Sequence, residues 1–155
     1  MTVIAWDGNT LAADGRSTCG SILVRNDINK IRTFSHPKYG EMIGAFTGTV
    51  GVFEPWIDHI KDHGFTKFDL GNGCDATALM ITPDGVCLEV HSDGMWTTET
   101  NPVAQGSGYT IAQHYLNNGT SALDAVRETI KSNITCGGHI ITWNRHTKRF
   151  RRYAR

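Results

Sequence analysis

The strongest constraint on the fold comes from three short apolar segments in the middle of the chain, joined by two tight turns. The segments cover residues 76–82, 86–90 and 95–97, and the turns cover residues 83–85 and 92–94. Both turns contain an Asp-Gly pair, which favours a turn because glycine adopts positive φ easily and aspartate hydrogen-bonds its own backbone. Connections this short join neighbouring antiparallel strands. The sequence therefore predicts an antiparallel meander here.

Two hairpins are predicted before the meander. The first pairs residues 2–6 with residues 10–13 across an Asp-Gly turn, which ties the start of the chain into a sheet. The second pairs residues 21–25 with residues 28–34, although the alternation of apolar and polar residues in its second strand is imperfect.

Helices and further strands complete the order of elements. A strand at 41–46 leads through a glycine turn into a helix, two helices at 107–116 and 121–132 follow the meander, and strands at 140–143 and up to Tyr153 end the chain. The first helix is predicted from one apolar stripe: Val52, Phe53, Trp56, Ile57 and Ile60.

This order predicts an α+β fold rather than a doubly wound parallel sheet, because strands and helices do not alternate one by one. No repeat or linker interrupts the chain, so we expect a single domain over residues 1–155. The glycine-rich segment 64–73 is predicted to be a surface loop.

Composition argues against several classes of function. The 15 lysines and arginines balance the 15 aspartates and glutamates, so no net charge draws the chain towards nucleic acid or an anionic membrane. No apolar run reaches the roughly 20 residues that span a bilayer, and we expect a cytoplasmic protein. The basic segment 146–155 is predicted to be an amphipathic edge strand, with a nucleic-acid or acidic-partner patch as the alternative.

Cysteine and histidine positions favour a protein without disulfides, metals or cofactors. The four cysteines are scattered and form no C-x-x-C pair: Cys19, Cys74, Cys87 and Cys136. His59 and His63 lie one helical turn apart and could bind a metal with a third ligand. No glutamate follows His59, so a solvent-exposed pair is the preferred interpretation.

Several short motifs resemble, in the same order, those of proteasome β-subunits, a family of N-terminal-nucleophile hydrolases. A threonine, Thr2, follows the initiator Met1. The later motifs are Asp-Gly-Arg at 14–16, Asn-Lys-Ile at 29–31, Gly-Ala-Phe-Thr-Gly at 44–48, Gly-Ser-Gly at 106–108 and Cys-Gly-Gly at 136–138. Each motif is common by itself, but their order over nearly the whole chain resembles the compact proteasome-like peptidases of bacteria and their viruses.

The resemblance implies a four-layer αββα sandwich of two antiparallel sheets flanked by helices, with Thr2 as the nucleophile once Met1 is removed. A threonine hydroxyl is a weak nucleophile, and an N-terminal threonine can use its own α-amine as the base. An α-amine titrates near pH 8, so it accepts a proton at neutral pH. The implied activity is hydrolysis of peptide or amide bonds through an acyl-enzyme.

The resemblance also assigns roles to six further residues. Lys30 would lie beside the Thr2 hydroxyl and favour its alkoxide-like form, Asp14 would hold Lys30, and Gly48 would donate its N–H to the oxyanion. Ser107 would position the α-amine, although a helix N-cap is its simpler role. Asn133 and Cys136 stand where the family commonly has aspartate and serine, which predicts weaker support for the amine.

The partners implied by the resemblance are a peptide or unfolded-protein substrate, a homo-oligomeric ring and a separate ATPase unfoldase. One alternative is a catalytically silent ring-forming protein in which Thr2 stays capped. Another is an amidohydrolase that acts on a small amide.

Overall fold

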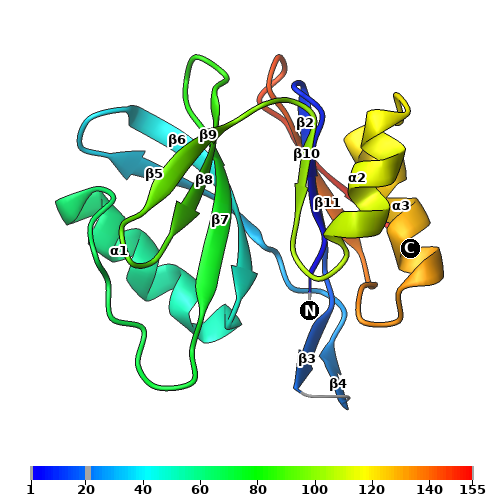
Figure 1. Cartoon of the computed structure of the whole chain (residues 1–155), viewed down its shortest axis with the longest axis horizontal. Coiled ribbons are helices and arrows are strands. Elements are labelled where there is room, and N and C mark those ends of the chain that lie inside the picture. Colours follow the sequence, from blue (N-terminus) through cyan, green and yellow to red (C-terminus); the bar gives the residue numbers. More distant parts are fainter. Residues whose placement is uncertain (1, 20–21, 155) are drawn as a thin grey trace. The chain divides into compact units, whose positions relative to one another are not determined.

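The computed structural model describes residues 2–19 and 22–154, apart from the side chain of Cys19 (Figure 1). Over these residues the chain is a mixed α+β protein with antiparallel sheets, as the order of elements predicts. It divides into two compact units, Met1–Ile31 with Asn101–Arg155, and Arg32–Thr100. The assignment of residues 1–155 to a single domain stays a prediction.

The first unit is built on a five-stranded sheet with the order β10-β1-β2-β11-β12. Its strands are β1 (Ile4–Trp6), β2 (Thr10–Asp14), β10 (Val103–Gln105), β11 (Ile140–Asn144) and β12 (Phe150–Tyr153). The predicted N-terminal hairpin is confirmed, and the two predicted C-terminal strands pair with each other, so the basic segment supplies the edge strand β12. Strand β10 was not predicted, because three residues are too few to show an alternating pattern.

Two helices cover one face of this sheet (Figure 1). They are α2 (Tyr109–Asn117) and α3 (Ala122–Ser132), and both were predicted. Ser121 caps α3 by accepting a hydrogen bond from the Asp124 amide at 3.2 Å. The core between helices and sheet is made mostly of small side chains, which let the two layers approach closely: Val3, Ala5, Ala12, Ala104, Ala112, Leu116, Ala122, Ala125, Val126 and Ile140.

A separate two-stranded sheet corrects the second predicted hairpin. Strand β4 (Ile22–Arg25) pairs with β3 (Ser17–Cys19), whereas β5 (Ile31–His36) joins the sheet of the second unit. The residues between them form no strand, because Asn29 Oδ1 accepts a hydrogen bond from the Ile31 amide and Lys30 turns into a buried ion pair. The predicted strand is confirmed from Ile31 on, but its start and its pairing are wrong, because a local turn and a distant partner outweigh the strand propensity of residues 28–30.

The second unit contains the predicted meander. Its sheet has the order β5-β6-β7-β8-β9, with β6 at Gly40–Gly48, β7 at Ala76–Ile81, β8 at Cys87–His91 and β9 at Trp96–Glu99. The ladders from β6 to β9 are antiparallel. The Asp-Gly turns were therefore sufficient to predict both topology and direction.

Helix α1 (Phe53–His63) packs on the core of this second unit through the predicted stripe. A short 3-10 turn (Val50–Val52) precedes it. The segment 64–73 forms no helix or strand, as predicted, but it is more than a surface loop. Phe65, Phe68 and Leu70 pack against the core, which fixes the segment to the unit.

Candidate functional site

A buried ion pair between Asp14 and Lys30 forms the centre of the candidate site. Lys30 Nζ donates to Asp14 Oδ1 at 2.8 Å, and the two side chains are 1% and 0% exposed. The same amine donates to the carbonyl of Arg16 at 2.7 Å. Burial lowers the pKa of Lys30, while the charge and hydrogen bond of Asp14 oppose that shift. Buried lysines are rare, and perturbed ones concentrate at functional sites.

The Asp14 carboxylate also connects three parts of the first unit. Its Oδ1 accepts a hydrogen bond from the Val3 amide at 3.1 Å, and its Oδ2 accepts one from the Gly137 amide at 2.9 Å. Asp14 ends strand β2 and lies opposite Ile140 in β11. One carboxylate oxygen thus links the Lys30 amine to the backbone of Val3, the residue that follows Thr2.

Thr2 is held by the Gly-Ser-Gly turn that precedes α2. The Thr2 nitrogen donates to Ser107 Oγ at 3.1 Å, and Ser107 Oγ donates to the Thr2 carbonyl at 3.2 Å. The Gly108 amide donates to the same carbonyl at 3.2 Å. Gly106 has φ +98°, and a Cβ there would lie 2.2 Å from the Thr2 carbonyl oxygen, so the turn requires glycine.

Ser107 is not the N-cap of α2, which corrects the simpler of its two predicted roles. The cap is Gly108, and no side chain bonds the first turn of the helix. The Ser107 hydroxyl instead lies at Thr2, 3.5 Å from Thr135 Oγ1 and 3.9 Å from Cys136 Sγ.

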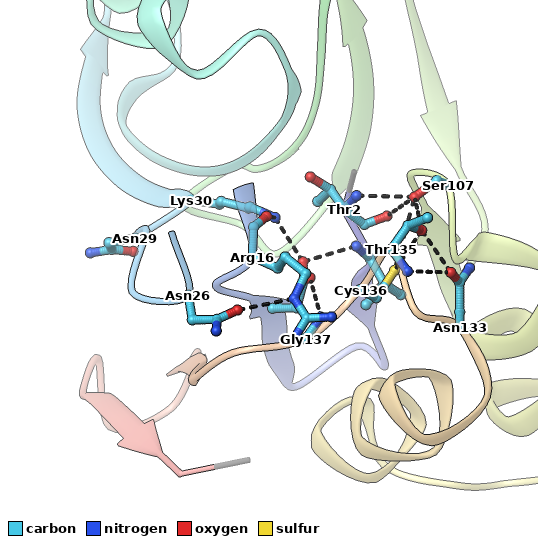
Figure 2. Close-up of polar contacts among 12 residues, drawn as sticks. Thr2, Arg16, Asn26, Asn29, Lys30, Ser107, Asn133, Thr135, Cys136 and Gly137 are labelled. Carbon is cyan, nitrogen blue, oxygen red and sulfur yellow. Dashed lines mark hydrogen bonds and ion pairs between the residues drawn. The ribbon is translucent and has the colours of Figure 1, made fainter. Parts of the chain in front are cut away.

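Cys136 and Thr135 lie beside Ser107, and Asn133 lies beside Thr135 (Figure 2). Asn133 Oδ1 accepts hydrogen bonds from Thr135 N at 3.0 Å and from Thr135 Oγ1 at 2.6 Å. Thr135 therefore stands between Asn133 and Ser107. The Cys136 thiol is buried, and this burial raises its pKa, so it is a neutral group at neutral pH.

The structure thus gathers all the predicted site residues except Gly48 into one network of the first unit. Gly48 ends strand β6 in the second unit, with φ +106° and a would-be Cβ 2.2 Å from the Asp75 carbonyl oxygen. Its positive φ and its close approach to Asp75 therefore require glycine, whether or not Gly48 has a catalytic role. The oxyanion role of Gly48 stays a prediction.

Sequence reasoning missed two members of the network. Thr135 links Asn133 to Ser107, and nothing in the sequence distinguishes it from other threonines. Arg16 gives its carbonyl to Lys30, while its side chain donates to Asn26 Oδ1 at 3.0 Å and to the Ile134 carbonyl at 2.7 Å. Arg16 belongs to the Asp-Gly-Arg motif, but the motif does not indicate that Arg16 connects Lys30, Asn26 and Ile134.

Other candidate sites gain no support within the described part of the chain. His59 Nε2 lies 2.8 Å from Thr66 Oγ1, and the described residues contain no cluster of three or more His, Cys, Asp or Glu side chains suited to a metal. Cys74, Cys87 and Cys136 are free thiols. None of the described helices is both long and apolar enough to cross a membrane.

Comparison with known proteins adds no assignment: neither a protein-family model nor a curated protein sequence matches the chain. The chemistry of the site therefore has to be argued from its geometry. A threonine, a buried ammonium group, a paired carboxylate and a serine hydroxyl lie together here. These are the residue types that a hydroxyl nucleophile, a supporting cation and an orienting hydroxyl require.

Proposed function

We propose that the chain is a threonine hydrolase that cleaves peptide or amide bonds through an acyl-enzyme on Thr2, after removal of Met1. The observation that carries the proposal is the Lys30–Asp14 pair, buried and hydrogen-bonded to the residue next to Thr2. Burying two charges is costly, and a structural role would be met as well by apolar side chains. A catalytic role for the Lys30 cation, which would stabilise the alkoxide-like form of the Thr2 hydroxyl, would explain why this buried pair is kept.

In the proposed reaction, the Thr2 hydroxyl attacks the substrate carbonyl carbon and forms the new C–O bond. Its proton passes to the α-amine, directly or through water, and then to the leaving amine as the C–N bond breaks. Water hydrolyses the resulting ester by the same route in reverse. Lys30 favours the alkoxide-like oxygen, and Ser107 orients the α-amine, whose nitrogen it already contacts at 3.1 Å. Gly48 would donate to the oxyanion.

We extend the proposal to the fold and assembly that the proteasome-like resemblance implies. The finer fold would be a four-layer αββα sandwich, and the protein would act as a cytoplasmic homo-oligomeric ring on peptides or unfolded proteins supplied by a separate ATPase. The exposed apolar hairpin β3–β4 is evidence that the protein binds a partner at this surface. Ile22, Leu23 and Val24 are 68%, 49% and 56% exposed in succession, an arrangement that marks interaction surfaces.

A silent assembly protein is the second candidate, and two observations favour it. Asn133 is engaged by Thr135 and carries no charge, and the Cys136 thiol is neutral, so neither residue supports a protonated amine. In this alternative the site residues stabilise the fold around a capped Thr2. Hydrolysis of a small amide is a third possibility with the same nucleophile.

The test is intact-mass analysis of the purified protein after treatment with an epoxyketone or β-lactone that reacts with N-terminal threonine. The proposal predicts loss of Met1 and a single covalent adduct on Thr2, absent in Thr2→Ala. Retention of Met1, or a free Thr2 that is never labelled, would favour the silent protein. Turnover of acylated small molecules without cleavage of peptides would favour the amidohydrolase.

A further inference from the structure

A cavity of about 380 Å³ lies in the first unit, at the end of the helix-covered face of its sheet. Strands β2, β11 and β12 and the start of α3 line it, and its polar lining residues include Thr10, Ser121, Thr142, Asn144, Arg149 and Arg151. Thr10 and Asp14 are the two ends of β2, so the cavity is about 13 Å from the candidate active site along that strand. It is therefore a separate feature.

Thr142 places a buried polar group in the wall of this cavity. Its side chain shares a sheet face with the residues opposite it, Ala12 in β2 and Arg151 in β12. Thr142 is 5% exposed and lines the cavity. It therefore adds a hydroxyl, a group that both donates and accepts hydrogen bonds, to the wall beside Arg151.

The charge of the cavity is one-sided. Arg149 and Arg151 both line it, and neither guanidinium has a partner in the part of the chain that the structure describes. No acidic side chain lines the cavity. Two acids at the start of α3 are engaged elsewhere: Asp7 Oδ2 accepts from the Ala122 amide at 2.9 Å, and Asp124 pairs with Arg127 at 3.3 Å.

The remaining polar lining groups can donate. Asn144 Oδ1 accepts from two backbone amides, at 2.9 and 3.0 Å, which leaves its NH₂ group to face the cavity. Ser121 Oγ accepts from the Asp124 amide and keeps its own proton for a ligand. Two guanidinium groups, several hydroxyls and an amide thus line one space, which suits a ligand rich in acceptor oxygens.

We propose that this cavity binds the phosphoryl group of a small organic phosphate. A phosphoryl group presents three acceptor oxygens to this donor set, whereas a carboxylate presents two. The volume exceeds what the anion alone needs and lies within the range of small-ligand pockets, so the organic part of the ligand also fits. Inorganic phosphate shares the binding chemistry and is the alternative source.

The experiment is calorimetric titration of the purified full chain with glycerol 3-phosphate, inorganic phosphate and acetate at constant ionic strength. We expect saturable 1:1 binding of the phosphates, at least about tenfold weaker in Arg151→Gln and Arg149→Gln, because each loses a charge-assisted hydrogen bond. Thr142→Val, which removes only the hydroxyl, should also weaken binding. Tighter binding of glycerol 3-phosphate than of inorganic phosphate would identify the organic phosphate as ligand, and equal binding would identify the free ion.

Arg152→Gln is the matched control, because Arg152 is the next residue of the same exposed strand and lies opposite Ile141, outside the cavity lining. It should bind as the wild type does. An equal loss in Arg152→Gln and Arg151→Gln would show a diffuse basic surface and overturn the proposal. So would the absence of saturable phosphate binding, or acetate binding as tight as that of phosphate.

Discussion

At the scale of single residues, the buried Asp14–Lys30 pair is central to the proposed chemistry and is the pair most sensitive to loss of one partner. Lys30 donates to Asp14 and to the Arg16 carbonyl, and Asp14 also accepts from the Val3 and Gly137 amides, so hydrogen bonds within the protein replace water around both charges. Pairs of this kind contribute little compared with apolar replacements, but removing one partner leaves an uncompensated buried charge. Removing one partner should therefore destabilise the protein by far more than the intact pair contributes to its stability.

Asp14→Asn is expected to lower the free energy of unfolding by about 3–5 kcal/mol, because Lys30 remains charged and buried. Urea denaturation measures this. Asp27→Asn, which breaks the exposed pair with Arg25, serves as the control and should change stability little. If Asp14→Asn does not fold, adding Lys30→Met should restore folding. An effect no larger than that of Asp27→Asn would contradict the buried-pair argument.

The cysteines give a second test at this scale. Burial raises the pKa of Cys136, and burial with nearby Glu99 and Glu89 raises that of Cys87 to about 12. Because the thiolate is the reactive form, both should react with iodoacetamide at pH 8 far more slowly than the partly exposed Cys74. Peptide mapping of native and urea-unfolded protein measures the rates site by site. Rapid native labelling of Cys136 would contradict its buried, neutral state.

At the scale of elements, the Gly-Ser-Gly turn holds Thr2 through backbone geometry. Gly106 supplies a positive φ and passes close to the Thr2 carbonyl, and Gly108 lies where a Cβ would be 2.6 Å from Thr129 Cγ2 and 3.0 Å from Val3 Cβ. Only glycine allows these approaches. The turn thereby connects the start of α2 to the start of β1.

Gly106→Ala should therefore disturb Thr2 as well as the turn. We compare it with Gly119→Ala, since Gly119 has a similar φ of +86° but has nothing within 4 Å of a would-be Cβ. Gly119→Ala should cost about 1–2 kcal/mol from backbone strain alone. Gly106→Ala should cost clearly more in thermal or urea unfolding and should abolish labelling of Thr2. Equal costs would show that the close approach to Thr2 is unimportant.

Strand β5 ends at a pH-sensitive group, His36. Its Nδ1 accepts hydrogen bonds from the Lys38 and Tyr39 amides at 3.0 and 3.2 Å, so protonation would break both. Burial, and then the charge of Lys38, lowers the pKa of His36. The unfolded state thus binds a proton more readily, and the stabilising contribution is fully present above pH about 6.5 and is lost as the pH falls below it.

Stability measured from pH 7.5 to pH 5 should accordingly fall less steeply in His36→Asn than in the wild type. Asparagine keeps an acceptor oxygen near the Nδ1 position but does not titrate. The difference in slope should approach, at most, about 1.4 kcal/mol per pH unit. His114→Asn, at an exposed position, should leave the slope unchanged. Parallel curves for wild type and His36→Asn would exclude a role for this histidine.

At the scale of the whole molecule, each compact unit has a core of its own. Small alanine-rich layers form the core of the first unit, and aromatic residues such as Phe46, Phe53 and Trp56 dominate the second. The β3–β4 hairpin is the exception, because its three consecutive apolar residues are exposed. Such a surface is explained by a partner, and the proposed ring would supply a second copy.

Leu23→Asp is expected to reduce the mass of the assembly in solution, because it places a charge in the apolar patch. Light scattering after size exclusion measures this mass against the 17.1 kDa monomer. Met95→Asp is the control, since Met95 is also exposed, at 67%, but lies outside the hairpin. A wild-type protein that is monomeric at all concentrations would contradict the ring. An assembly unaffected by Leu23→Asp would place its interface elsewhere.

Predictions that depend on residues close in sequence were confirmed, and those that depend on contacts between distant residues were missed. The meander and helices α1, α2 and α3 were predicted because turn residues and apolar stripes act within a few positions of each other. Strand β10 and the pairing of β4 were missed, because a three-residue strand and a choice of partner leave no local pattern. Thr135 was missed for the same reason, since its role arises only from Ser107 folding against it.

The sequence by itself determined the α+β class, the meander and the residue types required for a threonine nucleophile, because these depend on local propensity and on the chemistry of single side chains. Only the tertiary structure decided that Lys30 is buried on Asp14, that Ser107 contacts Thr2 across 105 positions of sequence, and that Asn133 bonds Thr135 instead. The cavity beside Thr142 also exists only in the folded chain. Each of these features joins residues far apart in sequence, and their contacts depend on how the layers pack.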